Sequence, residues 1–148
     1  MLYKLALERN TCGMIYAPRF AKLVEDAKHQ ITETTVEKVA AQLAAAAPTE
    51  PGFLLLDVRE DHEWAKGCLP GAHHLGRGIL ERDIEALAAE PTTAIVLYCG
   101  GGGRSALAAL SLKQMGYSNV TSMAGGYRGW VEAGHSKLDK PAVAKVPT

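Results

Sequence analysis

Short, continuous apolar runs alternate along the chain with longer segments in which apolar residues recur at helical spacing. The runs at 53–58, 94–98 and 120–123 predict strands, and the first two are typical of parallel strands buried on both faces. Shorter extended segments are expected at 31–34 and 72–75. Helices are predicted over the segments 19–29, 36–47, 60–66, 79–89, 104–115 and 127–133.

Turn and capping residues support the limits of these elements. Pro18 is suited to open the first helix, Thr34 or Thr35 to cap the second, and Gly116 to end the helix before the last strand. A turn is expected at 48–52. One face of the first helix is expected to carry its apolar residues, which are Phe20, Leu23, Val24 and Ala27.

Strands that alternate with helices argue for an α/β fold built around a mostly parallel sheet. The length of 148 residues favours one domain with a real hydrophobic core. We expect an N-terminal helical extension at 1–30, a core domain at 31–133 and a C-terminal tail at 134–148. The tail has two prolines and scattered lysines, so it is expected to be loosely attached, whereas residues 1–17 show no clear pattern.

Charge and cysteine content exclude several classes of protein. Sixteen basic and sixteen acidic residues cancel, so nothing favours a nucleic acid or a membrane surface as a partner. The apolar stretches are also too short to span a bilayer. Three cysteines (Cys12, Cys68 and Cys99) at spacings that match no metal site imply neither a disulfide framework nor a bound metal. This usage fits a reducing compartment and predicts a cytoplasmic protein.

The most informative segment is the loop that follows the strand at 94–98. It places Cys99 before four glycines (Gly100, Gly101, Gly102 and Gly103), which are followed by Arg104, Ser105 and a helix. Amides at a helix N-terminus are unsatisfied donors and lower the pKa of a nearby thiol. Glycines let successive amides approach one atom, so the loop suits a thiolate, a persulfide or a small oxyanion. Arg104 adds a positive charge at the edge of this loop if its side chain turns that way.

The length of the loop separates two kinds of cysteine chemistry. Cysteine-dependent phosphatases resemble one another in having five residues between the cysteine and an arginine, usually with a histidine before the cysteine. Here four residues separate Cys99 from Arg104, and Tyr98 precedes the cysteine. A shorter loop makes a tighter bowl, which favours a sulfur atom over a phosphate that must receive in-line attack.

With this loop, the chain resembles the single-domain rhodaneses, a family of sulfurtransferases, over about residues 31–133. The active-site pattern "Y-C-x-x-G-x-R-S" is matched by Tyr98, Cys99, Gly102, Arg104 and Ser105. Four further segments match family landmarks in order, namely 56–60 with Glu63 and Trp64, 67–72, 116–120, and Gly125 and Gly126 with Trp130.

The resemblance implies a central five-stranded parallel sheet with helices on both faces. It implies that the Cys99 thiolate attacks the outer sulfur of a donor such as thiosulfate, releases sulfite and becomes a persulfide. A thiophilic acceptor, such as cyanide or a cellular thiol, then removes that sulfur. The amides of Gly100 to Arg104 would hold the negative charge of the persulfide, and no metal or organic cofactor is needed.

Two departures from the family pattern leave alternatives open. The usual histidine of the "G-H-I-P-G-A" turn is Cys68 here, which would resolve the persulfide or form a disulfide only if it lay near Cys99. The all-glycine loop lacks a cationic side chain before Arg104, so thiosulfate is expected to be a poor donor. A relay or binding module that passes sulfur to a protein partner is therefore an alternative, with residues 1–30 as a partner surface. A cysteine-dependent phosphatase is a minor alternative.

Other polar residues have competing roles. Asp57 and Arg59 either orient the cysteine loop through hydrogen bonds or form structural ion pairs, and the structural role is favoured because a buried charge needs a partner. Arg104 either lines the pocket or pairs with an acid on the first connection from strand to helix. Ser105 either donates to the loop or is solvated. The adjacent His73 and His74 point to opposite sides of a strand and are not expected to bind one metal.

Overall fold

The protein is described by a computed structural model over residues 8–9, 15–46 and 52–141. Its centre is a five-stranded sheet in the order β3-β7-β6-β4-β5, in which every neighbouring pair is parallel. The strands are β3 (Thr32–Thr35), β4 (Leu54–Asp57), β5 (His73–His74), β6 (Ile95–Tyr98) and β7 (Val120–Ala124). The predicted α/β fold and parallel sheet are confirmed.

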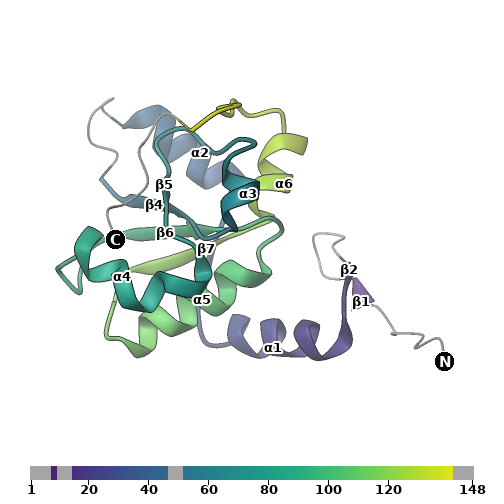
Figure 1. Ribbon diagram of the computed structural model, residues 1–148, viewed down its shortest axis with the longest axis vertical. Helices are drawn as coiled ribbons and strands as arrows, with labels where there is room; N and C mark the ends of the chain where they lie inside the picture. Colours follow the sequence, from purple (N-terminus) through teal and green to yellow (C-terminus); the bar gives the residue numbers. More distant parts are fainter. Residues whose placement is uncertain (1–7, 10–14, 47–51, 142–148) are drawn as a thin grey trace.

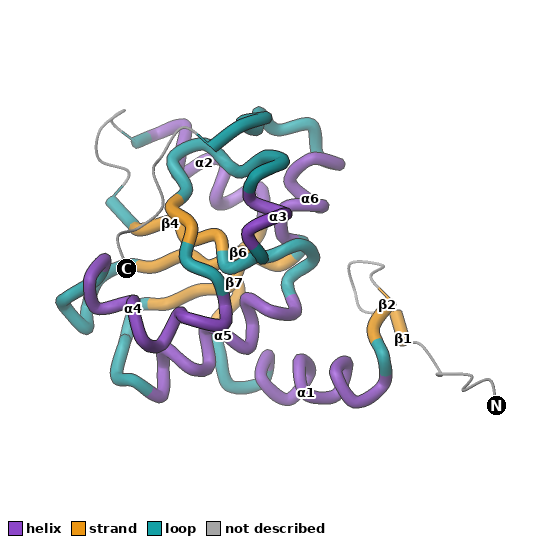
Figure 2. The backbone as a smooth tube through the Cα atoms, viewed as in Figure 1, coloured by secondary structure: helices purple, strands orange, loops and turns teal. Residues whose placement is uncertain are grey.

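Helices cover both faces of the sheet, and each face has its own apolar core (Figures 1 and 2). Alternate residues of a strand point to opposite faces, so Leu56 and Leu97 pack into one core while Leu55 and Val96 pack into the other. The first core is closed by α4 (Leu80–Leu87), which follows a short 3-10 turn at Arg77–Ile79, and by α5 (Gly103–Gln114). The second is closed by α2 (Val36–Ala45), α3 (Asp61–Trp64) and α6 (Gly126–Glu132).

Two local predictions about helix ends are settled by the structure. Thr35, and not Thr34, caps α2, because its hydroxyl accepts a hydrogen bond from the Lys38 amide at 3.1 Å. Gly116 has a φ of +99° directly after the last turn of α5, as expected for a glycine that ends a helix. The predicted turn at 48–52 lies outside the described residues except for Gly52.

The N-terminal segment contains more structure than was predicted. Strands β1 (Glu8–Arg9) and β2 (Ile15–Tyr16) pair as an antiparallel hairpin, which leads into α1 (Pro18–Lys28). Helix α1 packs against α5 and buries Val24 and Ala27 (Figure 1). Leu23, which its spacing places on the same apolar face, is 55% exposed.

The beginning of the C-terminal tail is held by hydrogen bonds, contrary to the expectation of a loose attachment. Leu138 and Cys68 exchange two backbone hydrogen bonds of 2.9 Å in an antiparallel bridge. The Trp130 indole also donates to the carbonyl of Ser136 at 2.9 Å. Along the described part of the chain, no helix has the length and apolar character needed to cross a membrane.

The register of the sheet sets the position of the functional candidates. Asp57 pairs with Tyr98 across β4 and β6, so both strands end at the same level. The carboxyl ends of parallel strands are where α/β proteins bind ligands. Arg59 and Cys99 follow these two ends, and the connections to α3 and α5 therefore meet at one edge of the sheet.

Candidate active site

Cys99 lies directly after β6, at the point where the chain turns toward α5. Cys99 is 1% exposed and forms no disulfide. The backbone N–H of Gly102 donates to its Sγ atom at 3.1 Å, and Sγ lies 3.5 Å from the Ser105 hydroxyl. The sulfur therefore meets an amide from the residue that caps α5 and a hydroxyl from the first turn of that helix.

Gly102 is the point at which the loop turns back on the sulfur. It has a φ of +102°, a left-handed conformation that a residue with a side chain rarely adopts. A Cβ atom here would also lie 3.4 Å from the Gly125 amide nitrogen and 3.6 Å from the Ala124 Cα. These distances are ordinary van der Waals contacts, so the backbone conformation is what explains a glycine at this position.

The start of α6 holds the opposite side of the loop. The Tyr127 amide donates to the Cys99 carbonyl at 2.8 Å, and the Arg128 amide donates to the Gly100 carbonyl at 3.0 Å. Because a trans peptide directs its N–H opposite to its carbonyl, the amides that follow these carbonyls point away from α6. Gly126 permits this contact, since a Cβ atom there would lie 2.5 Å from the Cys99 carbonyl oxygen.

The N-terminal segment covers the loop at Gly103. A Cβ atom added to Gly103 would lie 2.8 Å from the Tyr16 hydroxyl oxygen and 3.3 Å from a ring carbon of Phe20. The two rings pack edge to face with their centroids 4.9 Å apart. Segments separated by more than eighty residues in sequence thus contact each other at the active-site loop.

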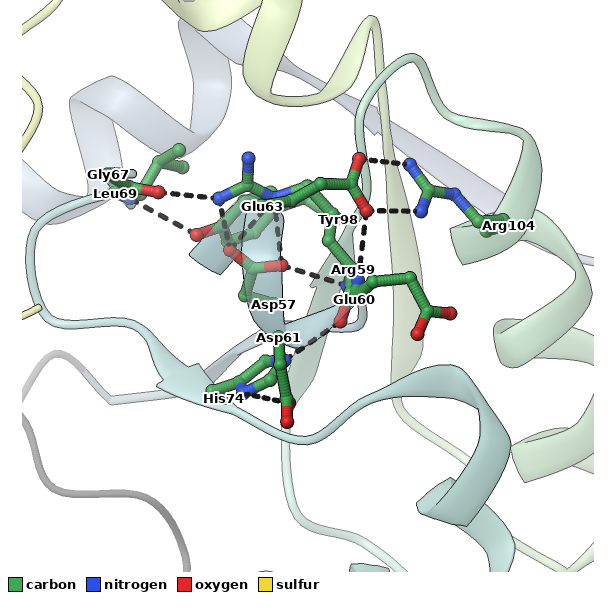
Figure 3. Close-up of polar contacts among 10 residues, drawn as sticks. All are labelled: Asp57, Arg59, Glu60, Asp61, Glu63, Gly67, Leu69, His74, Tyr98 and Arg104. Carbon is green, nitrogen blue, oxygen red and sulfur yellow. Dashed lines mark hydrogen bonds and ion pairs between the residues drawn. The ribbon is translucent and has the colours of Figure 1, made fainter. Parts of the chain in front are cut away.

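Arg104 pairs with an acid on the connection after β4, one of the two roles expected for it. Its guanidinium forms two hydrogen bonds to Glu63, with distances of 2.7 and 2.9 Å (Figure 3). The hydrogen bond from Arg104 lowers the pKa of Glu63 to about 2, and the same contact raises the pKa of Arg104. This pair lies beside Gly100, where an added Cβ atom would lie 3.0 Å from the guanidinium.

Ser105 is fully buried rather than solvated. Its hydroxyl oxygen lies 2.8 Å from the hydroxyl oxygen of Ser122, which is also fully buried on β7. Ser122 was not among the residues selected from the sequence, because a serine in a short strand gives no sign of a partner on a helix.

Asp57 and Arg59 form a buried ion pair behind the loop. Arg59 donates to both carboxylate oxygens of Asp57, with a shortest distance of 2.7 Å, and to the Gly67 carbonyl at 2.7 Å (Figure 3). Its guanidinium also lies 4.2 Å from the centre of the Tyr127 ring. These contacts fit the favoured structural role, and the Arg59 guanidinium also lies 5.8 Å from the centre of the ring of Tyr98, which directly precedes Cys99.

Cys68 lies on the other side of the sheet from Cys99. It packs in the core with Trp130, whereas Cys99 packs in the core with α5. Burial raises the pKa of the Cys68 thiol to about 11. These features do not support a disulfide or a resolving role for Cys68.

His74 of β5 has structural surroundings. The His74 ring stacks on Trp64 at 5.0 Å, and its Nε2 atom lies 2.8 Å from the Arg59 carbonyl oxygen (Figure 3). The described residues contain no group of three or more histidine, cysteine or acidic side chains arranged to hold a metal ion.

The fold and the site define a parallel α/β domain with a cysteine loop between a buried strand and a helix. The model of the rhodanese-like domain family matches residues 35–133, and the protein belongs to that family. Thiosulfate sulfurtransferase GlpE of Tolumonas auensis is 30% identical over 93 residues, which cover 63% of this chain and 86% of that protein.

Two other relatives broaden the comparison. Protein HIGH ARSENIC CONTENT 1, mitochondrial, of Arabidopsis thaliana is 32% identical over 129 residues, or 80% of this chain and 75% of that protein. YrkF of Bacillus subtilis, named as a candidate sulfur carrier protein, is 34% identical over 76 residues. That match covers 51% of this chain and only 40% of YrkF.

Solved structures share the fold at similar levels of identity. The polysulfide-sulfur transferase homodimer from Wolinella succinogenes is 27% identical with a TM-score of 0.67, and the match covers 84% of this chain and 90% of that chain. A protein of unknown function from Rhodopseudomonas palustris, described as a possible tyrosine phosphatase, is 28% identical with a TM-score of 0.69. That match covers 79% of this chain and 92% of that chain.

Proposed function

We propose that this protein is a sulfurtransferase that carries sulfane sulfur on Cys99 as a persulfide. The observation that carries the proposal is the hydrogen bond of 3.1 Å from the Gly102 amide to the Cys99 sulfur, at the N-terminus of α5. A helix N-terminus stabilises negative charge, so this amide favours a thiolate over a thiol. Membership of the rhodanese-like family agrees with this chemistry.

The reaction has two half-reactions. In the first, the Cys99 thiolate attacks the outer sulfur of a donor such as thiosulfate, the sulfur–sulfur bond of the donor breaks, and sulfite leaves with the electron pair. In the second, an acceptor such as cyanide or a thiol attacks the outer sulfur of the persulfide and regenerates the thiolate. Both steps move negative charge across the loop, where the amides of Gly100 to Arg104 are proposed to hold it.

The preferred donor is proposed to be a persulfide or polysulfide rather than thiosulfate. Gly100 to Gly103 have no cationic side chain, and the charge of Arg104 is largely neutralised by Glu63. Thiosulfate, a doubly charged anion, therefore gains little electrostatic attraction at this loop, and a singly charged organic persulfide needs less of it. Polysulfide is also doubly charged, and the similarity to a polysulfide-sulfur transferase is what supports it as a donor.

A second candidate function is a sulfur relay to a protein partner with little turnover of small molecules. The all-glycine loop favours it, because Gly100 to Gly103 offer no side chain that would bind a small anionic donor. The similarity to YrkF is consistent with it. The same persulfide on Cys99 is the carrier in both candidates.

Intact mass spectrometry tests the proposal. The full chain is incubated with thiosulfate or with inorganic polysulfide, and a gain of one sulfur atom is expected with polysulfide. Cys99→Ser should abolish the gain, while Cys68→Ala, which removes the buried thiol on the other face of the sheet, should leave it. No gain with either donor would refute the proposal.

Turnover distinguishes the two candidates. Formation of thiocyanate from cyanide at a rate typical of enzymes, roughly 1 per second or faster, would favour the sulfurtransferase over the relay. A stable persulfide with negligible thiocyanate would favour the relay. Hydrolysis of an aryl phosphate that is lost in Cys99→Ser would instead support a phosphatase.

A further inference from the structure

Ser122 is a polar residue in a place where the fold needs none. It lies in the middle of β7, between β3 and β6, and it is fully buried. A buried hydroxyl loses its hydrogen bonds to water and needs a partner inside the protein. The partner is the Ser105 hydroxyl at 2.8 Å, which itself lies 3.5 Å from the Cys99 sulfur.

The three side chains form a line from the centre of the sheet to the sulfur. Each hydroxyl has one proton to donate and lone pairs to accept with, so the direction of the hydrogen bonds along the line can change. When Cys99 is a thiol, its S–H donates to Ser105. When Cys99 is negatively charged, its sulfur has no proton, and Ser105 can bond to it only by donating its own O–H, beside the amide of Gly102.

A hydroxyl that donates to an anion is a stronger donor if it also accepts a hydrogen bond. Ser122 is placed to give that hydrogen bond to Ser105. We propose that Ser122 is a positioning residue for the sulfur chemistry, because it donates to Ser105 and thereby directs the Ser105 O–H at the charged sulfur of Cys99. The proposal rests on the proposed function in taking Cys99 as the sulfur carrier.

This arrangement differs in kind from the amide of Gly102. A backbone N–H is a fixed donor and favours the charged sulfur only. The pair of hydroxyls adapts, since rotation of two O–H bonds converts it from acceptor to donor without moving a proton off either oxygen. The same pair can therefore follow the charge at Cys99 as it rises and falls through the two half-reactions.

The pH dependence of Cys99 alkylation tests the proposal without any sulfur donor. Iodoacetamide reacts with the thiolate, and mass spectrometry of peptides follows Cys99 separately from Cys12 and Cys68. Ser105→Ala is expected to slow the alkylation of Cys99 at neutral pH by about tenfold, as for a lost hydrogen bond to a charged group. Ser122→Ala is expected to slow it by about threefold.

A comparison of Ser122→Ala in the wild-type chain and in a chain that already carries Ser105→Ala distinguishes a positioning role of Ser122 from a contribution to packing. If Ser122 acts through Ser105, its substitution has no effect in a chain that already carries Ser105→Ala. Thr121→Ala is the matched control, because the neighbouring residue of β7 directs its side chain to the opposite face of the sheet. It should leave the pH profile unchanged.

Three results would overturn the proposal. The first is that Ser122→Ala slows Cys99 alkylation equally in the wild-type chain and in the Ser105→Ala chain. The second is that Ser122→Ala has no effect on the rate in the wild-type chain. The third is that Thr121→Ala slows alkylation as much as Ser122→Ala does. Thermal denaturation of each variant shows whether the fold is retained. Alkylation needs no sulfur transfer. A failure of persulfide formation would therefore refute the proposed function, whereas the alkylation rates would still test the role of Ser122.

Discussion

The contact between Gly126 and the cysteine loop gives a prediction whose magnitude follows from the structure. We expect Gly126→Ala to destabilise the protein by about 3 kcal/mol. A left-handed residue with a side chain costs about 1 kcal/mol, which applies here because φ is +58°. The added Cβ would also lie 2.5 Å from the Cys99 carbonyl oxygen and 2.7 Å from the Gly100 carbonyl carbon.

Both of those contacts are with backbone atoms, so no flexible side chain can give way. The loop and α6 must separate, and the hydrogen bonds from the Tyr127 and Arg128 amides are lost or stretched. At about 1 kcal/mol for each hydrogen bond, the two account for the remaining 2 kcal/mol. The displacement also moves the amide of Gly102 from the sulfur, so persulfide loading of Cys99 should fall.

Gly134→Ala is the matched control. Gly134 has a φ of +81°, but an added Cβ there would meet no atom within 4 Å, so this variant has the conformational cost alone. Urea unfolding should place Gly126→Ala about 2 kcal/mol below Gly134→Ala, or roughly thirtyfold in the unfolding constant. Equal stability of the two variants, with normal persulfide loading in both, would refute this account of the loop.

Three further predictions concern the surroundings of Cys99. Because the folded pKa of Glu63 is about 2 and its ordinary value is 4.5, the ion pair with Arg104 stabilises the protein fully above pH 4.5 and is lost as the pH falls through about 2. Glu63→Gln should therefore lower the free energy of unfolding by about 1 kcal/mol at pH 7, after allowance for solvent screening. In urea unfolding at a series of pH values, the variant should lose less stability than the wild type below pH 4.5, and an equal loss would contradict this. Gly103→Ala should slow Cys99 alkylation, and adding Tyr16→Phe should restore part of the rate, since the Tyr16 hydroxyl lies nearest the added methyl group; no restoration would point to a backbone cause. Cys68 should react with iodoacetamide far more slowly than Cys99 at pH 8. Both residues are 1% exposed, but burial raises the pKa of Cys68 to about 11, whereas the Gly102 amide donates to the Cys99 sulfur; comparable rates by peptide mass spectrometry would contradict this difference.

The elements of the sheet could be predicted because their signals are local. Apolar runs mark β4 and β6, and the glycine run before Arg104 marks the loop between β6 and α5. The hairpin of β1 and β2 was missed, since each strand has two residues and little apolar pattern. The exposure of Leu23 could not be predicted, because spacing along a helix gives the width of an apolar face but not which edge of it reaches the core.

The contacts around the sulfur depend on chain segments that sequence patterns do not connect. Cys99 and the glycines are adjacent in sequence, whereas Glu63 and Ser122 reach the loop from other strands and helices. Pairing of Arg104 with an acid on a connection from strand to helix was one of the two roles predicted for it, but the identity of that acid required the register of β4 and β6. Ser122 required the position of α5 above β7.

The contact of Tyr16 and Phe20 with Gly103 has a consequence for where this protein can be truncated. The family model begins at residue 35, after both aromatic residues. A shortened form that starts at that boundary would keep the nucleophile and four of the five strands, but it would lose most of β3 and expose the first turn of α5 to solvent. Equally, a transplant of the cysteine loop into another scaffold would require an aromatic cover brought from outside the domain.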